Sequence, residues 1–208
     1  MQLSYDRAMP LRLALTDDLA PLGLVLRAGG TAVIPTDTVY GLACAAAQEA
    51  ACAELSRLKG RDPRQPSSVL VATLEAAEEL TGGDERTLAL LATGATVIVP
   101  NRERRYAWLC GVTPDRIGVR LSRFDPGLEM VLAAVGPLLA TSANVHGGAD
   151  PATLAAVPPA IADRVDVLVD GARVEGIPST VLDLTGPRPV ILRAGRQGPH
   201  TLKELLDA

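Results

Sequence analysis

Aromatic side chains are scarce in this sequence of 208 residues, which contains three Tyr, one Trp and one Phe. Hydrophobic residues nevertheless make up 48% of the chain, so the core must be built mainly from Ala, Leu and Val. Small aliphatic side chains of this kind suit helices packed on a sheet. The length is enough for one sizeable core, and we therefore expect residues 1–208 to form a single domain.

Cysteines are also few, since Cys44, Cys52 and Cys110 are odd in number and form no CxxC pair. This argues against a disulfide framework and a zinc site, and we expect no metal held directly by protein ligands. No segment approaches the roughly 18 to 20 apolar residues of a membrane span. The first residues lack the pattern of a secretory signal. We therefore expect a cytoplasmic protein without a membrane partner.

The sequence carries little net positive charge, with a net charge of −4 and a pI of about 5.2. This balance argues against a protein that binds nucleic acid over its whole surface, so any RNA contact must be local. The nucleotide-binding patterns GxxxxGK[ST] and GxGxxG are both missing, and any ATP must be bound in another way. Lysine is rare beside arginine: Lys59 and Lys203 are the only two.

Hydrophobic patterns predict alternating helices and strands in the first half and clustered strands in the second. This order predicts an α/β fold with a twisted mixed sheet flanked by helices. The expected strands are 31–35, 67–72, 95–100, 106–109, 117–121, 138–141, 165–169, 180–184 and 190–193. The expected helices are 16–27, 48–58, 74–80, 85–91, 127–134, 152–162 and 202–206.

Polar side chains follow the first expected strand, where residues 35–42 read PTDTVYGL and are expected to form a loop. One interpretation is a capped turn, in which Asp37 and the threonines satisfy local backbone groups. The other is the floor of a polar pocket, where Thr38 and Tyr40 orient a ligand.

A basic segment follows the expected helix 48–58, with Lys59 and Arg61 separated by Gly60. Cations at the carboxyl end of a helix meet its negative dipole, which explains one of them structurally. A glycine that removes bulk between two cations favours a phosphate site instead. In an arginine-rich chain, Lys59 indicates a need for a compact charge.

Three further segments carry candidate ligand contacts. TSANVHGG, which follows the expected strand 138–141, offers Ser142 and Asn144, while His146 is expected to be solvated. A serine hydrolase is disfavoured because GxSxG is absent. Arg120 lies on an apolar strand and needs an anionic partner, which is either a structural carboxylate or a bound one. Arg193 stands at a strand end before a glycine, as an exposed charge or a phosphate ligand.

Taken in order, PTDTVYGL, KGR, IGVR, TSAN, STV and LRAG resemble the YrdC-type threonylcarbamoyl-AMP synthases over roughly residues 11 to 197. The resemblance implies a short-form enzyme with an open cleft that makes threonylcarbamoyl-AMP and pyrophosphate from L-threonine, bicarbonate or CO₂, and ATP with Mg²⁺. It further implies partners in tRNA threonylcarbamoyl transfer, and contact with tRNA or double-stranded RNA.

By motif, the resemblance assigns threonine binding to Thr38, Arg120, Ser142 and Ser179. It assigns ATP binding to Lys59, Arg61, Gln65, Asn144 and Arg193, with Lys59 and Arg61 as catalytic residues.

Several positions depart from the family pattern, mainly on the ATP side, at Asp62, Ser67, Leu70 and Arg116. Asp62 is expected to weaken the local positive field. These departures, with the NRERR run at 101–105, support a second hypothesis, a YrdC-like module that binds RNA or nucleotide without adenylation. A charge run of this kind is more often a solvated face.

Overall fold

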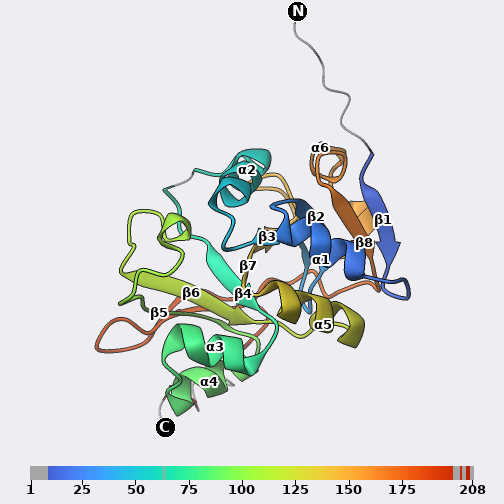
Figure 1. Cartoon of the computed structure of the whole chain (residues 1–208). Coiled ribbons are helices and arrows are strands. Elements are labelled where there is room, and N and C mark those ends of the chain that lie inside the picture. Colours follow the sequence, from blue (N-terminus) through green and yellow to red (C-terminus); the bar gives the residue numbers. More distant parts are fainter. Residues whose placement is uncertain (1–8, 63, 199–201, 203–204, 207–208) are drawn as a thin grey trace, which may run out of the picture.

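A computed structural model describes residues 9–62, 64–198, 202 and 205–206. The described strands form a single sheet in the order β1-β8-β2-β3-β7-β4-β6-β5-β9-β10 (Figure 1). The strands are β1 (Leu11–Ala14), β2 (Thr31–Pro35), β3 (Tyr40–Ala45), β4 (Ser68–Val71), β5 (Thr96–Pro100), β6 (Arg116–Leu121), β7 (Leu138–Ser142), β8 (Val167–Asp170), β9 (Val181–Asp183) and β10 (Val190–Arg193). The sheet contains both parallel and antiparallel pairs, which confirms the predicted mixed α/β fold.

Helices cover the sheet unevenly. They are α1 (Ala20–Arg27), α2 (Glu49–Lys59), α3 (Leu74–Thr81), α4 (Glu85–Ala92), α5 (Pro126–Val135) and α6 (Pro159–Ala162), with 3₁₀ turns at η1 (Ala107–Leu109) and η2 (Leu154–Ala156). α1 and α5 lie side by side on one face of the sheet (Figure 1). Their leucines pack against Ile34 and Ala43. α2, α3 and α4 bury Leu55, Ala77 and Leu90 in the larger core on the other face.

Because side chains alternate along a strand, the same strands supply both faces. On β5 and β6, Val97 and Val119 are fully buried in the core beneath α3 and α4. Their neighbours Thr96 and Arg120 point to the opposite face. α1 and α5 cover that face over β2 and β3, and their leucines do not extend over β5, β6 and β9. This part of the sheet is left to form a cavity.

Several elements differ from the prediction. β1 is an additional strand, whose side chains are exposed or half-buried and show little periodicity. The expected loop 35–42 contains the start of β3, which pairs antiparallel with β2. Residues 106–109 form a 3₁₀ turn rather than a strand, since Tyr106 has a positive φ of 50°. The expected helix 152–162 is interrupted by Pro158 and Pro159. Of the expected helix 202–206, residues 203 and 204 lie outside the described residues, and 202, 205 and 206 are helical.

None of the helices in the described part of the chain is long and apolar enough to span a membrane.

Candidate functional site

A cavity of about 440 Å³ lies on the uncovered face of the sheet. Its size is within the usual range for sites that hold small molecules. Alternate residues of β4, β5, β6 and β9 form its floor: Ser68, Leu70, Thr96, Ile98, Gly118, Arg120, Val181 and Asp183. The walls come from the β2–β3 turn, the segment after α2, the end of β7 and the segment before β9. Residues far apart in the sequence therefore meet around one space.

The β2–β3 turn is held mainly by Thr36. Its hydroxyl donates to the carbonyl of Val39 at 2.7 Å and accepts from the backbone N–H groups of Thr38 and Val39 at 3.3 Å. The capped-turn interpretation thus holds for Thr36, and Thr38 still lines the cavity beside it. Tyr40 is fully buried and its hydroxyl bonds the backbone of Gly171, so among the described residues its contacts are structural.

Asp37 does not cap its own turn and instead pairs with Arg120. One carboxylate oxygen, Oδ1, accepts from Arg120 Nη2 at 2.7 Å and from the Ser122 hydroxyl at 2.6 Å. Arg120 lines the cavity, whereas Asp37 is not among its lining residues. The anionic partner required by a buried arginine is therefore a structural carboxylate in this structure, and Arg120 keeps an edge toward the cavity.

The end of α2 delivers the basic segment to the site. Gly60 adopts a left-handed conformation at φ 69° and ends the helix, with its N–H bonded to the carbonyl of Arg57. A Cβ at Gly60 would meet nothing within 4 Å. The glycine is therefore needed for its backbone conformation at the helix end, and the expectation that it removes bulk between Lys59 and Arg61 stays a prediction.

Lys59 is buried, with 5% of its surface exposed, and its ammonium faces the turn after β7. It donates to the carbonyl and the hydroxyl of Ser142 and, at 2.9 Å, to Oδ1 of Asn144. Burial and, to a smaller extent, the charge of Arg61 lower the pKa of Lys59 to about 8, against an opposing effect of Asp150. A lysine whose pKa is shifted towards neutral pH in this way is typical of a functional site.

Arg61 and Arg193 lie close enough to affect each other. Burial lowers the pKa of Arg61, and the charge of Arg193 lowers it too. Arg61 donates through Nη2 to the carbonyl of Pro66, but its buried Nε forms no hydrogen bond with any described residue. Two neighbouring cations, one with an unused buried donor, form a site that an anion would stabilise.

Ser179 is held next to these arginines from two sides. Its hydroxyl and that of Thr96 are 2.8 Å apart, and its carbonyl accepts from Arg193 Nη2 at the same distance. Thr96 belongs to none of the sequence motifs, although a hydroxyl residue on a buried apolar strand is itself a signal. Asp150 and Asp183, which also line the cavity, were missed because each stands alone in the sequence.

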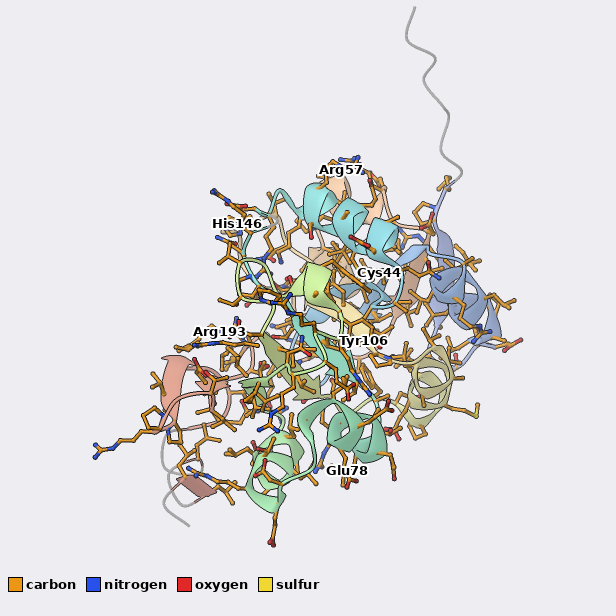
Figure 2. All side chains as sticks on the ribbon, turned by 60° about the vertical axis from the view of Figure 1, so that its left-hand side comes forward. Cys44, Arg57, Glu78, Tyr106, His146 and Arg193 are labelled. Carbon is orange, nitrogen blue, oxygen red and sulfur yellow. The ribbon has the colours of Figure 1, made fainter. Side chains whose placement is uncertain are left out.

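The structure therefore brings most of the predicted site residues together. Thr38, Arg61, Arg120, Ser142, Ser179 and Arg193 line the cavity directly. Lys59 and Asn144 lie one contact away, through Ser142. Gln65 is exposed and is not among the lining residues, and its contact with ATP stays a prediction. His146 is exposed at the edge of the molecule, as expected, whereas Cys44 lies in the interior (Figure 2).

The positions that depart from the family pattern have different surroundings. The Asp62 carboxylate points to Arg64, whose guanidinium Nη2 is 2.9 Å away, so its charge is neutralised outside the cavity. Ser67, Leu70 and Arg116 line the cavity. Arg116 forms an ion pair with Asp183 at 3.2 Å. Asp62 thus does not face the cavity, and Arg116 adds a cation there.

The cavity is lined by cations of two kinds. Arg120 is paired with the carboxylate of Asp37, whereas Arg61 and Arg193 bond backbone carbonyls. The charge of Arg193 lowers the pKa of both Arg61 and Arg120, so these arginines lie around one space. Hydroxyl groups of Ser142 and Ser179 line the same space. Such an arrangement can hold two negatively charged groups at a short, fixed separation.

Comparison with known proteins gives related results from sequence and structure. A model of the family described as "Telomere recombination", which covers Sua5, YciO and YrdC proteins, matches residues 24–195. The threonylcarbamoyl-AMP synthase of Xanthomonas campestris is 31% identical over 163 residues, which span 75% of this chain and 87% of the relative. That of Pyrococcus abyssi is 30% identical over 176 residues, spanning 82% of this chain and 52% of the relative.

The crystal structure of P. abyssi Sua5 complexed with L-threonine has a TM-score of 0.81 and 25% identity. The likeness covers 95% of this chain and 61% of that one. The fold is thus similar over nearly the whole described chain, which spans little more than half of the P. abyssi protein.

Proposed function

The chain belongs to the family of Sua5, YciO and YrdC proteins, and on this premise we propose that it is a threonylcarbamoyl-AMP synthase. Its substrates are L-threonine, bicarbonate or CO₂, and ATP, and its products are threonylcarbamoyl-AMP and pyrophosphate. The observation that carries the proposal is one cavity lined both by Arg120, which the carboxylate of Asp37 balances, and by Arg61 and Arg193, which bond backbone carbonyls. Two anionic substrates, a carboxylate and a triphosphate, match these cations.

Threonine is proposed to occupy the region around Arg120. The guanidinium would bind its carboxylate, while the hydroxyls of Thr38, Ser142 and Ser179 would bind its polar groups. ATP is proposed to place its phosphates near Lys59, Arg61 and Arg193, with Asn144 and Gln65 as amide contacts.

The proposed reaction takes place between the substrates, so the protein has to position them and needs no nucleophile of its own. The amine of threonine adds to CO₂ and loses a proton, which gives a carbamate. A carbamate oxygen then attacks the α-phosphorus of ATP as the bond to pyrophosphate breaks. Lys59 and Arg61 act as catalytic residues by neutralising the charge that develops on the phosphates. Holding the two anions in line supplies the rest of the acceleration.

Mg²⁺ is proposed to arrive as part of the MgATP substrate. Within the described residues, no three His, Cys, Asp or Glu side chains gather as a metal site would require. Asp150 and Asp183 line the cavity singly. This donor set fits an ion carried by phosphate oxygens, which supports charge neutralisation on the triphosphate.

The product is proposed to pass to the tRNA threonylcarbamoyl-transfer machinery in the cytoplasm, from a chain that forms one domain. Contact with tRNA or double-stranded RNA is a further proposal. The alternative of an RNA-binding module without adenylation has less support. Arg105 of the NRERR run is paired with Glu79 and Glu103, which neutralises part of that charge.

The proposal is tested by pyrophosphate release with ATP, Mg²⁺ and bicarbonate, with and without L-threonine, followed by mass analysis of the nucleotide. We expect release that depends on both threonine and bicarbonate, with threonylcarbamoyl-AMP as product. Folded protein that releases none would contradict the synthase, and salt-dependent RNA binding by that protein would support the binding module.

A further inference from the structure

Asp37 stands behind the arginine that faces the cavity. The side chains of Arg120 and Asp37 are 10% and 15% exposed, and they form an ion pair at 2.7 Å. Asp37 is not among the residues that line the cavity, whereas Thr36 and Thr38 on both sides of it are. A ligand in the cavity would therefore meet Arg120, and Asp37 would act on that ligand only through it.

Two contacts fix the plane of the Arg120 guanidinium. Nη2 donates to Asp37, and Nε donates to the carbonyl of Gly94 at 3.3 Å. Gly94 sits close to the carboxylate, since a Cβ there would be 3.4 Å from Asp37 Oδ2. Nη1 forms no hydrogen bond with any residue in the described part of the chain, and it is the edge left for a ligand. Because the guanidinium is planar, fixing Nε and Nη2 also fixes the direction in which Nη1 can donate.

The carboxylate of Asp37 forms ion pairs with two arginines, Arg120 and Arg196. Arg196 Nη1 lies 3.4 Å from its Oδ2 and donates to its carbonyl, while Ser122 donates to Oδ1. Burial lowers the pKa of Arg120, the charges of Arg196 and Arg193 lower it as well, and Asp37 opposes them. Without this carboxylate, a buried guanidinium would be left among like charges and would lose its fixed direction.

We infer that Asp37 is a positioning residue that aims Arg120 at the carboxylate of the amino-acid substrate, and so sets the preference for an amino acid over its carboxylate-free analogue. The inference rests on the proposed function. Ser122 supports the same carboxylate from behind. Removing Asp37 is expected to weaken the binding of threonine more than that of ATP, because the two arginines near the phosphates do not contact it.

The test compares Asp37→Asn and Asp37→Ala with the wild-type protein in calorimetric titration with L-threonine and with L-threoninol, which lacks the carboxylate. We expect threonine affinity to fall about tenfold in Asp37→Asn and up to about a hundredfold in Asp37→Ala, the range of a charged hydrogen bond. L-threoninol affinity should change less than twofold. Asp84→Asn is the matched control, since it removes a carboxylate that caps α4 far from Arg120.

A double-mutant cycle with Arg120→Lys separates an effect of Asp37 on the direction of Arg120 from an effect on the stability of the protein. If Asp37 acts through Arg120, Asp37→Asn will change threonine affinity much less in the Arg120→Lys background than in the wild type. Equal losses in both backgrounds, or a parallel loss of L-threoninol binding, would overturn the inference. Unchanged threonine affinity in folded Asp37→Asn would do the same. Wild-type protein that binds no threonine would instead refute the proposed function and remove the basis of the inference.

Discussion

Replacing Lys59 with methionine removes a buried charge while keeping most of the side-chain volume. The shift of its pKa from 10.5 to about 8 corresponds to a cost of about 3 kcal/mol for keeping the charged form in the folded protein. Against the gain from removing this cost, the variant loses the hydrogen bonds of Lys59 to Ser142 and Asn144. The free energy of unfolding of Lys59→Met at pH 7 should therefore differ from that of the wild type by less than about 2 kcal/mol.

The pH dependence of stability follows from the direction of the shift. The folded pKa lies below the unfolded one, so between about pH 8 and pH 10.5 the unfolded chain binds more protons at Lys59 than the folded protein. The wild type should therefore gain stability from this group as pH rises through that window. Below pH 8 both states are protonated and the cost is constant. Lys59→Met should lack this gain, and the difference between the two proteins isolates Lys59 from other titrating groups.

Activity should respond far more strongly than stability. A positioned charge that neutralises phosphate oxygens is typically worth about 10² to 10³ in turnover. The assay is threonine-dependent pyrophosphate release at saturating ATP, combined with urea unfolding at pH 7, 8, 9 and 10. Lys59→Gln, which also lacks the charge but keeps a donor, serves as the comparison. Folded Lys59→Met with normal adenylate synthesis would refute the catalytic role, and an unchanged pH slope of stability would refute the buried-charge account.

Other variants test separate parts of the site. Arg193→Ala should raise the KM for ATP about tenfold or more with little change in that for threonine, measured by steady-state pyrophosphate release; an effect on threonine alone would contradict its placement near Arg61. Gly111→Ala should destabilise the protein by several kcal/mol, measured by thermal unfolding, because φ is 59° and a Cβ would lie 2.2 Å from the carbonyl oxygen of Arg64; wild-type stability would show that this loop gives way. The three cysteines are free and buried, and should react with a thiol reagent much faster after unfolding; rapid labelling of native protein would contradict their burial.

Most of the fold could be predicted from the sequence, because many elements carry strong local signals. The run at 31–35 is apolar and ends at Pro35, and β2 has these bounds. α3 follows Thr73, whose hydroxyl caps the helix, and is followed by the left-handed Gly82. Local signals did not predict elements whose formation depends on contacts with distant parts of the chain. β1 is added to the sheet edge by pairing with β8, and nothing in its own pattern predicts this.

The candidate site could be predicted as a set of residues but not as an arrangement. Motifs indicated that Arg120 needs an anion, but they left a ligand and a structural carboxylate as equal alternatives. Only the pairing of β6 with β5 and the approach of the β2–β3 turn bring Asp37 to it. The direction of the Lys59 ammonium, toward Ser142 and Asn144, likewise depends on where α2 ends relative to β7.

The arginines around the cavity are stabilised in two different ways. Two of them bond backbone carbonyls: Arg61 donates to the carbonyl of Pro66, and Arg193 donates to the carbonyl of Ser179. Carbonyls satisfy donors without cancelling charge, so these arginines stay available to phosphates. Arg120 is different because a full carboxylate balances it. An amino-acid carboxylate arriving there meets a guanidinium whose charge is already partly neutralised, and its binding must depend on direction more than on charge. If the substrates bind as proposed, the phosphate region selects by charge, and the amino-acid region by the angle at which Asp37 holds one arginine.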